Sequence, residues 1–181
     1  MENLVAQAKY DQSAFSELYR MYVKNVYSFF YSYLRDKQDA EDLTSQTWEV
    51  VLRKISDLRS DEIKVFKVWL FRIAKNNLNK FFFKKKITSF INIDDQKDLL
   101  PSKEPSPYEV AYQKETSDEI LKYIHMLPDK QRSVILLRYS GGLKNYEIAE
   151  VLKMSEINVA SNISRGLSTL KNHLTSLKCI D

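Results

Sequence analysis

The sequence is poor in the residues that interrupt helices and in those that form covalent or metal cross-links. Among its 181 residues there are three glycines, four prolines and one cysteine. Because glycine and proline mark most turns, their scarcity predicts a chain that is largely helical. The single cysteine, Cys179, excludes a disulfide framework and a cysteine zinc cluster, and we expect it to be a free thiol.

Signals for a membrane protein or an enzyme are also missing. No apolar run approaches the ~20 residues that cross a bilayer, and the first residues lack the basic-then-apolar pattern of a signal peptide. His125 and His173 each lack a partner at ligand spacing, and no glycine-rich phosphate loop or nucleophile motif occurs. We therefore expect a cytoplasmic protein without membrane insertion, with no metal or other cofactor, and without enzymatic activity.

The pattern that is present predicts an all-α fold of two small helical domains. Helical spacing runs through residues 1–86 and resumes at 108–181, and we expect a flexible linker at 87–107, which is acidic and holds three of the four prolines. The aromatic stripe within residues 4–35 is typical of a core. Residues 1–86 carry 16 Lys and Arg against 11 Asp and Glu, so this domain is expected to make the main electrostatic contact with nucleic acid.

The helix expected at 39–54 has two distinct faces. Its apolar face is formed by Ala40, Leu43, Thr47, Val50 and Val51. A second stripe is polar and mostly acidic, and it consists of Asp39, Asp42, Gln46 and Glu49. Acidic residues in a first turn also complement the helix dipole, so the stripe is either a solvated face or a docking surface for a basic partner protein.

The helix expected at 62–83 mixes aromatic and basic residues. We place Phe66, Trp69, Leu70, Ile73, Ala74 and Phe81 on its inner face. The outer face is expected to carry Lys64, Lys67, Phe71, Lys75, Asn79 and Lys80. Three phenylalanines followed by three lysines, residues 81–86, favour contact with single-stranded nucleic acid, in which cations follow phosphates and rings stack on bases. The alternative is an ordinary amphipathic helix with a basic end.

Residues 127–174 predict a helix-turn-helix. A first helix opens at Leu127–Pro128 and ends at Gly141–Gly142. A short helix is expected at 145–152, and Ser155 is expected to cap a final helix. The apolar stripe of that final helix is Val159, Ile163, Leu167, Leu170 and Leu174. Its other face shows Asn158, Ser161, Asn162 and Arg165, which suit phosphates and base edges in a major groove.

Three motifs in this order resemble the sigma factors of bacterial RNA polymerase. They are Asp39-Ala40-Glu41-Asp42-Leu43, the segment from Phe66 to Asn76, and Leu127 to Arg132 together with Glu147 to Leu152. The chain is most similar to the extracytoplasmic-function (ECF) group of the sigma-70 superfamily, which keeps only conserved regions 2 and 4. The resemblance covers nearly the whole chain.

The resemblance implies partners and residue roles. Domain 1–86 would be region 2, which binds core polymerase and melts the −10 element, and domain 108–181 would be region 4, which reads the −35 element. The partners would be the β′ clamp helices and β subunit of core RNA polymerase, promoter DNA and an anti-sigma factor. The implied polymerase-binding residues are Asp39, Glu41, Asp42, Gln46 and Glu49. The implied −10 residues are Lys67, Arg72, Lys75, Asn76, Asn79, Lys84, Lys85 and Lys86. The helix at 66–86, together with the preceding loop at 56–63, would melt the −10 element and hold a flipped base. The implied −35 residues are Lys144, Ser155, Asn158, Ser161, Asn162 and Arg165.

The chain also departs from this family pattern. Lys153 stands where the turn usually has glycine, so we expect a lysine at positive φ. Gly166 stands where alanine is frequent, at a cost of about 1 kcal/mol in helix propensity. Ala160 and Asn162 replace a frequent Lys and Arg. The alternative to a sigma factor is a stand-alone helix-turn-helix regulator, which would dimerise and bind an operator without polymerase.

Overall fold

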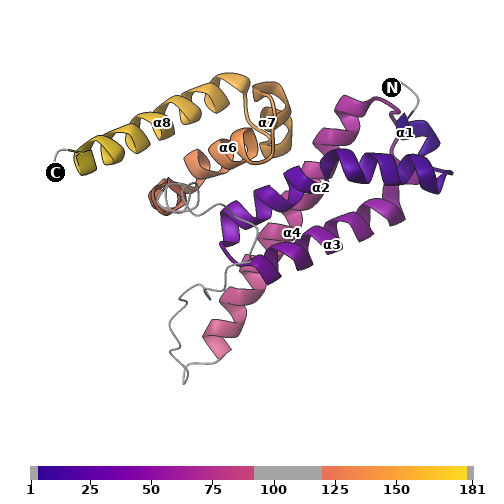
Figure 1. The fold of residues 1–181 in the computed structure, drawn as a ribbon, viewed down its shortest axis with the longest axis horizontal. Coiled ribbons are helices and arrows are strands. Elements are labelled where there is room, and N and C mark those ends of the chain that lie inside the picture. Colours follow the sequence, from indigo (N-terminus) through magenta and orange to yellow (C-terminus); the bar gives the residue numbers. More distant parts are fainter. Residues whose placement is uncertain (1–3, 92–119, 179–181) are drawn as a thin grey trace. The chain divides into compact units, whose positions relative to one another are not determined.

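The computed structural model describes residues 4–91 and 120–178, and within these ranges it contains helices and no strand. The chain divides into two compact units, Met1–Pro101 and Ser102–Asp181, which are considered separately (Figure 1). Within the described ranges, none of the helices combines the length and the apolar character needed to cross a membrane. The all-α prediction is confirmed.

The first unit is a bundle in which α3 packs against both α2 and α4 (Figure 1). Its elements are α1 (Leu4–Gln7), α2 (Gln12–Leu34), α3 (Lys37–Lys54), the 3₁₀ turn η1 (Ile55–Asp57) and α4 (Ile63–Ile91). The Asp11 carboxylate caps α2 by accepting from the backbone N–H groups of Ser13 and Ala14. Asp36 caps α3 by accepting from the N–H of Asp39 at 2.8 Å. Short acidic caps therefore set where α2 and α3 begin.

Aromatic rings from α2 and α4 form much of the core of this unit. Of the stripe predicted within residues 4–35, Phe29, Phe30 and Tyr33 are buried, whereas Tyr19 is exposed. Phe29, Phe30, Phe66 and Phe71 are fully buried. The rings of Phe29 and Phe71 meet edge to face, with centroids 5.9 Å apart. Edge-to-face pairs are a favoured geometry that adds to the burial of apolar area, so the α2–α4 contact is made by specific ring packing.

The faces predicted for α4 are wrong at several positions, since Ile73 and Phe81, both expected on the inner face, are only half-buried. Phe71, expected on the outer face, is fully buried, whereas Trp69, expected in the core, is only half-buried. Burial instead follows Phe66, Leu70, Ala74 and Leu78, each four residues apart, with Phe71 widening the stripe on the side away from Trp69. With apolar residues all around the helix, packing against α2 and α3 decides which ones are covered.

The predicted linker begins too early. Helix α4 continues to Ile91, five residues beyond the expected boundary at 86. The rest of the predicted linker, residues 92–107, lies outside the described residues, as does Cys179.

The second unit contains the predicted helix-turn-helix. Residues 120–126 are helical, and they are followed by α6 (Asp129–Tyr139), α7 (Asn145–Leu152) and α8 (Glu156–Lys178). Pro128 lies one residue before α6 and not within its first turn. The range of α7 and the capping of α8 are confirmed, because the Ser155 hydroxyl accepts from the N–H of Asn158 at 3.2 Å. Lys153 adopts the expected left-handed conformation, with φ at 54°.

Gly166 has a packing role in this unit. A Cβ placed on this residue would lie 2.5 Å from Cδ1 of Ile135, a buried side chain of α6. This distance is far shorter than van der Waals contact, so glycine is what allows α8 to approach α6 this closely. The sequence indicated only its cost in helix propensity.

Candidate nucleic-acid and polymerase interfaces

The first unit has an open pocket beside the start of α4. Its volume is about 390 Å³, and it is lined by Lys54, Asp57, Leu58, Arg59, Ser60, Val65 and Trp69. The lining combines an indole ring, two cations, a carboxylate and a hydroxyl. A base can stack on the ring, phosphates can pair with the cations, and the carboxylate and hydroxyl can meet the polar edge of a base.

One face of α4 continues from this pocket along the helix. Val65 and Trp69 line the pocket, and Arg72, Asn76 and Asn79 follow at intervals of three or four residues. Residues with that spacing share one face of a helix. Arg72, Asn76 and Asn79 are exposed, so three of the predicted −10 residues form a polar track that begins at the pocket.

The remaining predicted −10 residues lie elsewhere on α4. Lys67 is half-buried. Lys75 is also half-buried, and its Nζ donates to the Tyr33 hydroxyl of α2 at 3.4 Å and lies 4.9 Å from the ring centroid. Lys84 and Lys86 are exposed near the end of the described side chains. The predicted set is therefore not one surface, and Arg72, Asn76 and Asn79 are its members that continue directly from the pocket.

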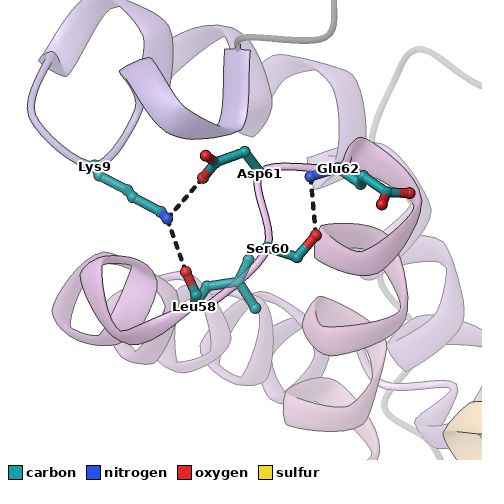
Figure 2. A network of polar contacts seen from close by, with 5 residues as sticks. All are labelled: Lys9, Leu58, Ser60, Asp61 and Glu62. Atoms are coloured by element: carbon teal, nitrogen blue, oxygen red, sulfur yellow. Dashed lines mark hydrogen bonds and ion pairs between the residues drawn. The ribbon is translucent and has the colours of Figure 1, made fainter.

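The loop between η1 and α4 is anchored from a distant part of the chain. The Nζ of Lys9, from the turn between α1 and α2, donates to the Leu58 carbonyl and to Oδ1 of Asp61, each at 2.7 Å (Figure 2). Within the loop, the Glu62 N–H donates to the Ser60 hydroxyl at 3.2 Å, next to the start of α4. The family resemblance pointed to this loop, but no local pattern pointed to Lys9, since its partners lie 49 and 52 residues away.

The acidic stripe of α3 is exposed, as the helical spacing predicts. Asp42, Gln46 and Glu49 are exposed, and Asp39 is partly covered. Glu41 is exposed as well, 3.9 Å from Lys37 in the same helix. Asp39 pairs with Lys85 of α4 at 3.1 Å, so a predicted polymerase residue contacts a predicted DNA residue.

In the second unit, the predicted −35 residues of α8 lie on its first turns. Asn158 and Arg165 are exposed, and Ser161 and Asn162 are half-exposed. The Asn162 amide donates to the Asn158 carbonyl at 2.7 Å, so it is turned back along its own helix. Ile157 is 81% exposed at the helix start, an apolar residue on this surface that polarity-based prediction left out.

Two further predicted −35 residues lie in the turns between helices. Ser155 caps α8, so its hydroxyl is engaged with the Asn158 N–H. The Lys144 N–H donates to Oε2 of the buried Glu147 at 2.7 Å, which fixes the start of α7 and leaves the exposed lysine side chain at the turn.

No group of His, Cys, Asp or Glu able to hold a metal ion occurs in ranges 4–91 and 120–178.

Comparisons with known proteins assign both units to regions of one protein family. Residues 18–87 match the model described as Sigma-70 region 2, and residues 117–170 match the model described as Sigma-70, region 4. The chain is similar to the ECF RNA polymerase sigma factor SigM of Bacillus subtilis (strain 168), with 32% identity over 155 residues that cover 86% of this chain and 91% of SigM. It is similar to SigX of the same organism, with 30% identity over 174 residues that cover 92% of this chain and 87% of SigX.

A solved structure shows a similar fold. The sigma factor RpoE from Bartonella quintana, in complex with the anti-sigma factor NepR, has 21% sequence identity to this chain and a TM-score of 0.68. The match covers 89% of this chain and 96% of that one.

Proposed function

The chain belongs to the sigma-70 family, in its ECF group, and we propose that the pocket and polar track of α4 capture a base of the −10 element during promoter melting. As a sigma factor the chain binds core RNA polymerase and directs it to promoters. Sigma factors are initiation factors, and the catalytic step belongs to the polymerase; we infer that this chain has no catalytic activity of its own. We also infer that it acts in the cytoplasm, beside polymerase and DNA.

The observation that carries this proposal is the position of Trp69. Its half-exposed indole lines the pocket, and Arg72 and Asn76 lie one and two turns farther along the same face. A base that has left the duplex loses its stacking partners, and an aromatic ring replaces them. The Arg72 guanidinium and the lysines of α4 then supply the charge that a single strand requires.

We propose that the two units divide promoter recognition. The first unit would bind the clamp helices of β′ through the exposed acidic stripe, because an acidic surface in a basic domain suits a basic protein partner and not DNA. The second unit would place the start of α8 in the major groove of the −35 element, with Lys144 contacting the DNA backbone. An anti-sigma factor is a further expected partner, on the family resemblance.

The promoter can be found by adding the purified chain to core polymerase and sequencing the transcripts made from genomic DNA. Defined start sites that appear only when both are present support a sigma factor. Footprints on DNA without polymerase would instead favour the stand-alone regulator.

Trp69→Ala then tests the pocket. Base stacking on an aromatic ring contributes about 1–3 kcal/mol, so we expect this variant to lose roughly five- to 150-fold in affinity for the single-stranded −10 element. Thymines in the −10 region should react less with permanganate, while duplex binding is kept. Tyr10→Ala, which removes a 91% exposed ring of the same unit, is the control. Melting by Trp69→Ala at the parent's rate would contradict the proposal.

A further inference from the structure

The ammonium of Lys9 is placed unusually for a lysine. The side chain is 12% exposed, whereas its carboxylate partner Asp61 is 53% exposed. Its two 2.7 Å bonds go to a backbone carbonyl and a carboxylate of the same loop (Figure 2). A charged donor gives shorter and stronger hydrogen bonds than a neutral one, so Lys9 holds this loop at two points.

The loop it holds is a wall of the pocket. Leu58, whose carbonyl accepts from Lys9, lines the pocket together with Arg59 and Ser60, while Lys9 itself does not. Residues 58–62 form no helix. Other bonds of this loop are local: the Leu58 N–H donates to the Ile55 carbonyl at 3.1 Å, and the Glu62 N–H donates to Ser60. Local bonds shape the two ends of the loop, whereas the Lys9 bonds fix it relative to the rest of the unit.

We propose that Lys9 is a positioning residue that preorganises this wall for base capture, an inference that rests on the function proposed for the pocket. Ordering an irregular backbone costs free energy for every residue that is fixed. A loop that is already held in its binding conformation does not incur that cost when the base enters. Lys9 thus acts on single-stranded −10 DNA without contacting it.

The experiment uses holoenzyme reconstituted with the full-length chain. The probe is a fluorescein-labelled single-stranded oligonucleotide that carries the non-template −10 element of a promoter found as described above. A series of oligonucleotides replaces each nucleotide in turn with an abasic site. The measured quantity is the abasic penalty, which is the ratio of the Kd for the abasic strand to the Kd for the intact strand.

With the parent chain, the abasic penalty at the position read by the pocket should be about tenfold, within the range expected for loss of one stacked base. Lys9→Met should reduce that penalty to about twofold, because a mobile wall no longer favours the captured base. Lys24→Met removes the same charge from an exposed site on α2 and should leave the penalty unchanged.

The outcomes separate the two proposals. If Lys9→Met weakens intact and abasic strands equally, so that the penalty is retained, Lys9 has only a general structural role and this inference is overturned. If no abasic position affects the parent, the pocket does not capture a base, and the proposed function falls together with this inference. Should Lys9→Met fail to fold by circular dichroism, Asp61→Ala removes one anchor from the exposed side, and an unchanged penalty in that variant overturns the inference.

Discussion

Because α8 packs closely against α6, we predict that Gly166→Ala destabilises the second unit when Ile135 is present and stabilises it when the Cδ1 methyl group of Ile135 is removed. In a helix interior, alanine is favoured over glycine by about 1 kcal/mol. At this site the new Cβ would lie 2.5 Å from Ile135 Cδ1, and Ile135 is 2% exposed, so the displaced methyl group has little room. Overpacking of this kind costs about 1–3 kcal/mol. The net expectation for the second unit is a destabilisation of about 1 kcal/mol.

Ile135→Val removes the atom that clashes. The next contacts of the added Cβ are Ile135 Cγ1 and Gln131 Cβ, both at 3.5 Å, which is ordinary van der Waals distance. Ile135→Val alone should cost about 0.5–1.5 kcal/mol. In that background Gly166→Ala should stabilise the unit by about 0.5–1 kcal/mol, because the gain in helix propensity remains and the clash is gone. The coupling between the two substitutions is then about 1.5–2 kcal/mol, a magnitude typical of residues that touch directly.

Hydrogen–deuterium exchange of peptides from α6 and α8 in the full-length chain measures this locally, since it reports the opening free energy of the second unit alone. All four members of the cycle are compared under the same conditions. The argument from close packing would be refuted if Gly166→Ala changed the opening free energy by the same amount, with the same sign, in the parent and in the Ile135→Val background.

Two further predictions concern the interfaces of the first unit. The double variant Asp42→Lys with Glu49→Lys should weaken core polymerase binding by a few kcal/mol, because exposed acidic residues are replaced by positive charges that face a basic partner. The circular dichroism spectrum of the helices should stay unchanged. Normal holoenzyme assembly by this variant would mean that the polymerase-binding surface lies elsewhere. Lys84→Ala with Lys86→Ala should reduce the slope of log affinity against log salt for single-stranded −10 DNA by about 0.7 for each phosphate that is no longer neutralised. An unaltered slope in this double variant would mean that these lysines are only a solvated helix end.

Features set by neighbours in the chain could be predicted from the sequence. The range of α7, the Ser155 cap and the left-handed Lys153 each depend on residues within one or two turns, and each is confirmed. The family resemblance made the function predictable as well, because it rests on the order and spacing of three motifs and not on any single residue.

Features set by packing between distant segments could not be predicted. The helix at 63–91 carries aromatic residues on all sides, so the choice between Phe71 and Trp69 for the core is made by α2 and α3, not by its own period. From the sequence alone Gly166 is only a weak helix former, because its close packing against Ile135 involves a second helix. Lys9 carried no local signal, because its partners lie in a loop some fifty residues away in the sequence.

The ion pair between Asp39 and Lys85 would link the two proposed binding surfaces of the first unit thermodynamically. A polymerase that takes up the Asp39 carboxylate leaves Lys85 available to a phosphate, and by reciprocity DNA that takes up Lys85 leaves Asp39 available to the polymerase. The pair is 3.1 Å long, with the lysine side chain 50% exposed and the aspartate side chain 29% exposed, and such partly solvated pairs contribute at most about 1 kcal/mol. The cooperativity that this ion pair would transmit is therefore limited to about fivefold, so polymerase and DNA would each modestly strengthen the binding of the other without being required for it.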